Sequence, residues 1–122
     1  MPPLILIVDD NADARLMLKT VLEAQGFVTA CAEDGQAALN MIKANQPDLI
    51  ISDIQMPNLN GIELIKILRS QIETKDTPVL VTSAQHSGVL ADAMKAGGTA
   101  AATKPVQLES LIKLITQLLI VN

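Results

Sequence analysis

Five short apolar segments recur along the chain, and this recurrence limits the fold more than any other feature of the sequence. They are LILIV, FVTACA, DLIIS, PVLVT and TAAAT, at residues 4–8, 27–32, 48–52, 78–82 and 99–103. Each interval between successive segments is long enough for one helix and two short loops. That rhythm is typical of repeated strand–helix units and predicts an α/β fold.

The intervals themselves carry helical periodicity. In the first, apolar residues recur at i, i+3, i+4, i+7 and i+8; Asn11 is a suitable N-cap, and Gly26 is expected to end the helix. Similar stripes predict helices over 61–72 and 108–119, and weaker ones over 35–45 and 87–96. The residues expected on core-facing stripes include Met17, Met41 and Met94.

The first, third and fourth segments are apolar at consecutive positions, as in strands that are buried on both faces of a parallel sheet. The second segment contains Thr29 and Cys31 and is expected at a sheet edge. The fifth holds only Ala and Thr, which makes it a poor strand former by propensity. We therefore predict one doubly wound, five-stranded parallel domain over residues 1–122, with helices on both faces.

Composition excludes several classes of function. The net charge is −4 and no Lys/Arg cluster is present, which argues against direct nucleic-acid binding. No apolar run approaches the ~20 residues of a membrane span, and the Met1-Pro2-Pro3 start is not a basic leader. A single cysteine, Cys31, fits a reducing compartment. We expect a cytoplasmic protein with no membrane segment.

Polar residues follow the predicted strands. Asp9 and Asp10 follow the first, Asp53 the third, Ser83 the fourth and Lys104 the fifth. The carboxyl ends of parallel strands share one edge of the sheet, where ligands bind. Three carboxylates there would oppose one another's ionisation, and Mg²⁺, with its preference for oxygen ligands and phosphates, would relieve that conflict. Because a carboxylate can also be the nucleophile, the pattern indicates a phosphate site that could form an aspartyl phosphate.

Four segments together carry a resemblance to a known family: LILIVDD (4–10), DLIISDIQMPNLNG (48–61), PVLVTSA (78–84) and TKP (103–105). They resemble the receiver domain of two-component response regulators, close to the single-domain chemotaxis regulators. The resemblance implies a flavodoxin-like sheet of order 2-1-3-4-5. It also implies a signalling module that accepts a phosphoryl group from a histidine kinase or histidine phosphotransfer protein. Such a module catalyses only its own phosphorylation and dephosphorylation, and it presents a switched surface to a downstream protein target.

The resemblance also assigns residues at the metal site. Asp53 matches the phosphoacceptor, which also contacts the metal. Asp10 matches the direct Mg²⁺ ligand, and Asp9 the acid that acts through metal-bound water. The backbone carbonyl of Gln55 matches the third protein ligand. Gly61 matches the residue that opens the third helix.

Three further residues match those that contact the phosphoryl group. Ser83 matches the hydroxyl residue of the switch, and the backbone amide of Ala84 is expected to face the phosphoryl oxygens. Thr82 is the alternative hydroxyl, but counting from Pro78 favours Ser83. Lys104 matches the lysine that pairs with a phosphoryl oxygen, and its bond to Pro105 is usually cis in this family.

The chain departs from the family at two positions. Ala101 and Val106 stand where aromatic residues are usual, so we expect output either through the Ser83 loop and the backbone of the fourth helix or weaker than is usual in the family. The last helix is broadly apolar, and Leu114, Ile120 and Val121 fall outside its main stripe. The outer side of this helix is therefore expected to pack against a homodimer partner, a downstream target or a further part of a longer protein. The homodimer would form through the face of the fourth helix, fifth strand and fifth helix.

Three other functions remain open on the sequence. A degenerate receiver would bind partners constitutively, and the absence of the usual aromatic residue at Ala101 is compatible with that function. A flavodoxin-like FMN carrier would need a Ser/Thr/Gly phosphate loop where Asp9 and Asp10 stand, and aromatics to hold the flavin. A hydrolase of the haloacid dehalogenase type would need a second Asp where Gln55 stands.

Overall fold

The computed structural model describes the main chain of residues 2–84 and 88–121, and side chains up to residue 120. It contains a five-stranded parallel sheet of order β2-β1-β3-β4-β5. The strands are β1 (Leu4–Val8), β2 (Val28–Ala32), β3 (Leu49–Asp53), β4 (Val79–Ser83) and β5 (Ala100–Thr103). The predicted order is confirmed, and the second segment is an edge strand as expected.

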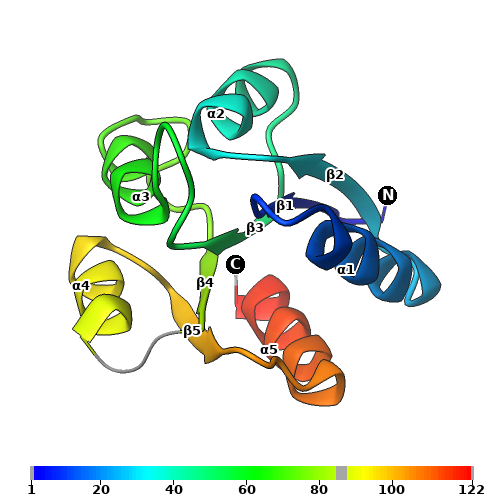
Figure 1. Ribbon diagram of the computed structural model, residues 1–122. Helices are drawn as coiled ribbons and strands as arrows, with labels where there is room; N and C mark the ends of the chain where they lie inside the picture. The colour runs from blue at the N-terminus through cyan, green and yellow to red at the C-terminus, as the bar shows by residue number, and fades with distance from the viewer. Residues whose placement is uncertain (1, 85–87, 122) are drawn as a thin grey trace.

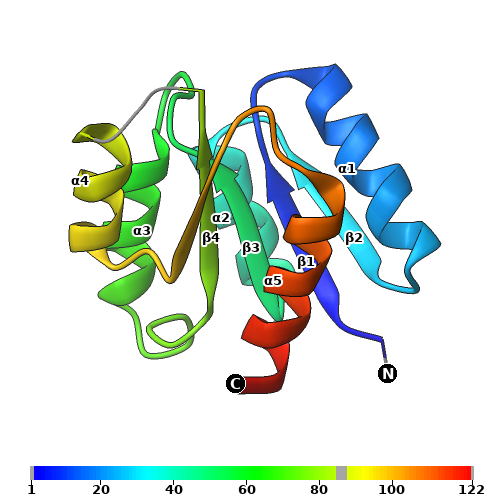
Figure 2. The same cartoon turned by 90° about the horizontal axis from the view of Figure 1, so that it is seen from below.

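Five helices complete the doubly wound arrangement: α1 (Ala12–Ala24), α2 (Gly35–Ala44), α3 (Gly61–Arg69), α4 (Gly88–Ala96) and α5 (Leu108–Val121). Helices α1 and α5 cover one face of the sheet, and α2, α3 and α4 cover the other (Figure 1). The predicted start of the fourth helix at residue 87 lies outside the described residues. Figure 2 shows the strands side by side, with the loops that follow them gathered at one end of the molecule.

The alternating direction of side chains along each strand divides the interior into two cores. Ile5, Ile7 and Ile51 belong to the core under α1 and α5, together with Leu111 and Ile115. Their neighbours along the same strands, such as Leu6 and Val8, belong to the core under α2, α3 and α4. Consecutive apolar residues in the central strands are thus explained, because each face of the sheet requires its own apolar set.

Two of the three methionines predicted on core-facing stripes lie outside the core. Met17 is 48% exposed and Met94 is 38% exposed, whereas Met41 packs against the core as expected. Residues at the margin of a helical stripe share its periodicity without reaching the sheet, so spacing alone placed them inside.

The residues predicted on the outer side of α5 differ in their surroundings. Leu114 packs inward against the core, whereas Ile120 is 78% exposed; the side chain of Val121 lies outside the described part of the chain. No helix among the described residues combines the length and apolar character that a membrane span requires.

Candidate functional site

Asp9 is fixed at the turn between β1 and α1. The residue is 3% exposed, and its Oδ1 accepts a hydrogen bond from the Asn11 N–H at 2.9 Å. Asn11 in turn caps α1 by accepting from the Ala14 N–H, as predicted. Arg15 donates from Nη1 to the main-chain oxygen of Asp9 at 2.7 Å. The local helix start therefore holds Asp9 in place, while Asp10 beside it is exposed to solvent.

Asp53 is the last residue of β3 and is 8% exposed. Its Oδ1 accepts from the N–H of Ile54 at 2.8 Å. The following loop folds back so closely that a Cβ on Gly61 would lie 2.4 Å from the main-chain oxygen of Asp53. Only glycine fits at this approach, which explains why Gly61 opens α3 as predicted.

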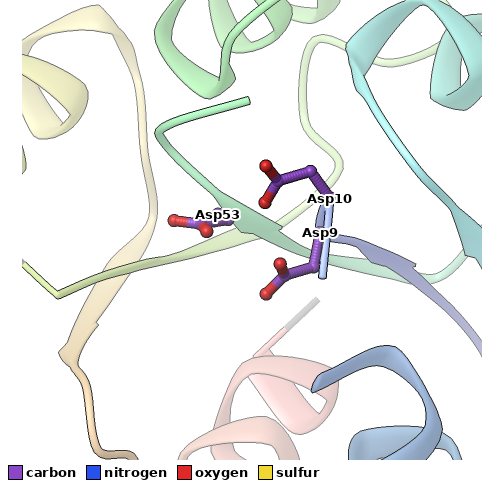
Figure 3. A group of neighbouring side chains, drawn as sticks. All are labelled: Asp9, Asp10 and Asp53. Carbon is purple, nitrogen blue, oxygen red and sulfur yellow. The ribbon is translucent and has the colours of Figure 1, made fainter. Parts of the chain in front are cut away.

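The structure brings three of the predicted carboxylates together. Each of Asp9, Asp10 and Asp53 offers an oxygen within 4.8 Å of the others. Figure 3 shows their carboxyl groups extending to the same side of the strand ends, two from the end of β1 and one from the end of β3. An oxygen-only donor set of this kind fits a hard cation such as Mg²⁺.

Lys104 lies between two of these acids. Its Nζ is 3.1 Å from Asp9 Oδ2 and 3.1 Å from Asp53 Oδ2. Its main-chain N–H donates to the Ser83 oxygen at 2.8 Å, and its bond to Pro105 is cis, as the resemblance implied. The sheet thus delivers one ammonium group to a cluster of three carboxylates.

The pKa values of Asp53 and Lys104 are shifted by burial and by their charged neighbours. Burial raises the pKa of Asp53, and the nearby Asp9 adds to that rise, although the hydrogen bond and charge of Lys104 act in the opposite direction. For Lys104, partial burial alone would lower the pKa, but hydrogen bonds to Asp9 and Asp53 raise it above its usual value. An additional cation would therefore stabilise the ionised form of Asp53.

The two hydroxyl residues at the end of β4 lie on opposite sides of the strand. Thr82 is paired with Asp53 and lines a cavity of about 570 Å³ that also borders Asp9, Ala84 and Lys104. Ser83 is completely buried, and alternation places its side chain toward the core of α2, α3 and α4. Thr82 therefore borders the site, although counting from Pro78 favours Ser83 as the switch residue. The assignment of the switch to Ser83 stays a prediction.

The remaining predicted residues lie in exposed segments. Gln55 is exposed in the loop that joins β3 to α3, and Ala84 is exposed directly after β4. Ala101 is also exposed, on the edge strand β5. The roles of the Gln55 carbonyl and the Ala84 amide stay predictions, since each would contact a group that is absent from the structure.

Two contacts near the site were not anticipated from the sequence. One is the hydrogen bond from Arg15 to Asp9, and the other joins Asp34, before α2, to Asn58, in the β3–α3 loop. Asp34 is recognisable as an N-cap from its place before a helical stripe. Its bond to Asn58 spans 24 residues of sequence, and no local pattern predicts it.

Comparison with known proteins gives a consistent result. The family model of the response regulator receiver domain matches residues 5–116. The chemotaxis protein CheY of Bacillus subtilis is 35% identical over 116 residues, which cover 94% of this chain and 96% of CheY. A crystal structure of a putative response regulator from Chloroflexus aurantiacus superposes with a TM-score of 0.93 at 32% identity, covering 98% of both chains.

Other relatives are longer than this chain. The regulatory protein AtoC of Escherichia coli is 37% identical over 107 residues, which cover 88% of this chain but only 23% of AtoC. The chain spans about half the length of other response regulators that it matches. The similarity to these proteins therefore concerns one domain of each.

Proposed function

The chain belongs to the family of response regulator receiver domains, and on that premise we propose that Asp53 is its phosphoacceptor. A histidine kinase or a histidine phosphotransfer protein would donate the phosphoryl group. Receiver domains act between histidine kinases and downstream effectors, and this chain is such a signalling module. The observation that carries the assignment is the convergence of Asp9, Asp10 and Asp53 within 4.8 Å, with Lys104 bridging two of them.

The chemistry requires little beyond placement and charge. An oxygen of Asp53 forms a bond to phosphorus while the P–N bond of the donor's phosphohistidine breaks, and the departing imidazole nitrogen takes up a proton. The transferring group is loosely bonded in such reactions, so positioning and charge neutralisation provide most of the catalysis. Lys104 already lies within hydrogen-bonding distance of Asp53 and can turn to a phosphoryl oxygen.

Magnesium fits the donor set of this site. Asp10, Asp53 and the carbonyl of Gln55 would hold the ion directly, and Asp9 would hold it through water. When bound, the ion supplies positive charge against the phosphoryl oxygens. The residues of this chain do the rest: Asp9 stays anchored by the Asn11 N–H, and Asp53 is oriented by the Ile54 N–H.

We propose that the chain acts on no separate substrate and catalyses only its own phosphorylation and dephosphorylation. The complete set of three acids and a lysine favours this reading over a degenerate receiver that binds partners constitutively. Phosphorylation would add about −1.5 to −2 charges to the carboxyl edge of the sheet, by analogy with other phosphorylated side chains. We expect Ser83, at the end of β4, and the amide of Ala84 beside it to respond to the phosphoryl group.

The donor protein would approach over α1. Leu16 is 61% exposed there, and the half-exposed Met17 borders the cavity that leads to Asp9 and Lys104. Exposed apolar side chains beside a charged site suit a protein partner.

A second copy of this chain, docking through the face of α4, β5 and α5, is a further proposed partner. Sedimentation velocity at high protein concentration is the measurement that tests it. We place these exchanges in the cytoplasm, in keeping with a chain that carries one cysteine.

The test uses acetyl phosphate and a phosphohistidine protein as parallel donors. With Mg²⁺ and acetyl phosphate, intact-mass measurement should detect one added phosphoryl group, absent from Asp53→Asn and absent when EDTA is present. Leu16→Ser should accept as fast as wild type from acetyl phosphate but several-fold more slowly from the phosphohistidine protein, because only the protein donor contacts α1. A phosphoryl group that persists in Asp53→Asn would contradict the assignment.

A further inference from the structure

Asp34 and Asn58 join two loops that are separate in sequence. Asp34 precedes α2 and its side chain is almost fully buried, while Asn58 lies in the loop from β3 to α3. The Nδ2 of Asn58 donates to Oδ2 of Asp34 at 2.7 Å. The two helices that these loops begin lie side by side on one face of the sheet (Figure 1).

A main-chain contact reinforces the junction. The N–H of Gly35 donates to the oxygen of Leu59 at 3.0 Å. A Cβ on Gly35 would lie 2.5 Å from that same oxygen, so the two loops approach too closely for any larger residue. The junction therefore depends on a residue without a side chain at position 35 and on the paired side chains beside it.

Asn58 has an unusual backbone conformation that makes the β3–α3 loop turn sharply at this residue. Asn58 has φ of +67°, a left-handed conformation that asparagine tolerates better than most residues. The adjacent Leu59 N–H donates back to the Pro57 oxygen at 2.8 Å. Residues 57–59 thus form a tight turn, and Asn58 at its centre is hydrogen-bonded to Asp34. Asn58 lies three residues after Gln55 in the sequence.

Helix capping alone does not require this bond. Asp34 caps α2 with Oδ1, which accepts from the Ala37 N–H at 2.8 Å. Its second oxygen is left over for another partner and accepts from Asn58 instead. Both hydrogen bonds lower the pKa of Asp34, the one from Ala37 more than the one from Asn58. The side chain therefore serves two elements at once, and the second is the loop that holds Gln55.

We propose that the Asp34–Asn58 hydrogen bond positions the β3–α3 loop so that the Gln55 carbonyl can reach Mg²⁺, and that it thereby sets the magnesium affinity of the site. This inference rests on the proposed function, because it assigns a positioning role toward the metal that Asp53 needs. Neither side chain belongs to the set that would hold the metal. Their effect is transmitted by the main chain of residues 55–58, between the bond and the carbonyl.

The primary test is Asn58→Gly, which accepts the left-handed conformation and leaves the net charge unchanged, while removing the bond to Asp34. We expect its Mg²⁺ affinity, measured by calorimetric titration with MgCl₂, to fall about tenfold, the lower end of what outer-shell substitutions cost. The matched control is Asn45→Gly, at the opposite end of α2, where Asn45 is the exposed C-cap residue. It should bind Mg²⁺ as wild type does.

A charge-exchange variant identifies the hydrogen bond itself as the cause. In the double substitution Asp34→Asn with Asn58→Asp, the amide and carboxylate change places, so that the bond re-forms with reversed direction and the same net charge. The asparagine introduced before α2 can still cap that helix through its side-chain oxygen. We expect this double variant to regain Mg²⁺ affinity within about threefold of wild type, because outer-shell support of the loop is restored.

Several outcomes would overturn the proposal. Magnesium affinity of Asn58→Gly equal to wild type would do so, as would an equal loss in Asn45→Gly or a double variant as weak as Asn58→Gly. In each case the wild-type chain would still bind Mg²⁺ and accept a phosphoryl group, so that the proposed function would stand. A wild-type chain that bound no Mg²⁺ would remove both.

Discussion

Charged side chains are balanced in different ways at the two ends of the strands, which we call the carboxyl edge and the amino edge of the sheet. At the carboxyl edge, Asp9, Asp10 and Asp53 form one cluster, and the ammonium group of Lys104 contacts Asp9 and Asp53. At the amino edge, the guanidinium of Arg69 lies between the end of α3, the segment before β4 and the turn before β5. There, Nε donates to the Gly97 oxygen at 2.9 Å, and Nη1 donates to the Thr77 oxygen at 2.7 Å.

The partners of Arg69 are neutral. Besides these two carbonyls, its Nη1 donates to the oxygens of Thr74 and Lys75, both at 3.2 Å, and its Nη2 to the Thr99 hydroxyl at 3.3 Å. Burial lowers the pKa of Arg69, with Asp76 acting in the opposite direction, although an arginine stays charged in proteins. Dipoles from three segments thus surround one cation, and the arrangement needs no added ligand.

The difference indicates what each edge is for. The acidic cluster holds three carboxylates beside the ammonium group of Lys104, so a bound metal ion would stabilise it by adding positive charge, and the ion and Lys104 together would attract a phosphoryl group. The Arg69 site closes three chain segments around a cation and leaves nothing for a ligand to supply. A substitution at the first edge should therefore alter chemistry, and one at the second should alter stability.

The largest expected effect is at Lys104. Lys104→Met should slow phosphorylation by acetyl phosphate about 100-fold, as removal of one donor to a developing oxyanion typically does. The same variant should bind Mg²⁺ more tightly, because the ammonium group no longer competes for Asp9 and Asp53. Intact-mass time courses and calorimetric titration measure the two effects.

Lys113→Met provides the control for this prediction, because Lys113 is exposed on α5. Its rate and its Mg²⁺ affinity should equal those of wild type. A Lys104→Met variant that reacted at the wild-type rate would show that the carboxyl edge does not depend on its one lysine.

The next largest effect is at Arg69. Arg69→Met should lower the free energy of unfolding by about 2–3 kcal/mol, since it leaves several buried or half-buried carbonyl oxygens without a donor. Arg69→Lys should recover only part of that loss, because a single ammonium cannot reproduce the forked guanidinium. Urea unfolding followed by circular dichroism is the measurement, as the chain has no tryptophan.

The folded fraction of Arg69→Met should accept a phosphoryl group at the wild-type rate. A rate that fell together with stability would contradict the division of labour between the two edges. It would mean that the turn before β5, which Arg69 holds through Gly97, also positions Lys104 at the far end of that strand.

The two edges also differ in how far the sequence predicts them. The acids of the carboxyl edge stand directly after apolar runs, so a local pattern combined with parallel topology places Asp9 and Asp53 together. The role of Arg69 depends on contacts with Gly97 and Thr99, 28 and 30 residues away, whose main-chain oxygen and hydroxyl carry no sequence signal. The Asp34–Asn58 bond was missed for the same reason.

The smallest expected effect concerns Asp53 and pH. Because burial raises the pKa of Asp53, its ionisation costs stability in the folded state wherever the carboxyl group would be charged in the unfolded chain. That cost is absent at pH values well below the ordinary aspartate pKa, grows as the pH rises through the raised pKa, and is constant above it. Asp53→Asn should therefore be more stable than wild type at pH 7 without Mg²⁺, and the two should converge in acid.

Urea unfolding of both proteins from about pH 4 to pH 8 tests this prediction, and added Mg²⁺ sharpens it. Magnesium should stabilise wild type by mass action and reverse the order at pH 7, because the variant binds the ion more weakly. The loss in Arg69→Met should stay constant over the same pH range, because a guanidinium does not titrate there. An Asp53→Asn variant less stable than wild type at pH 7 without Mg²⁺ would mean that Lys104 alone balances the acids, and the carboxyl edge would then resemble the amino edge.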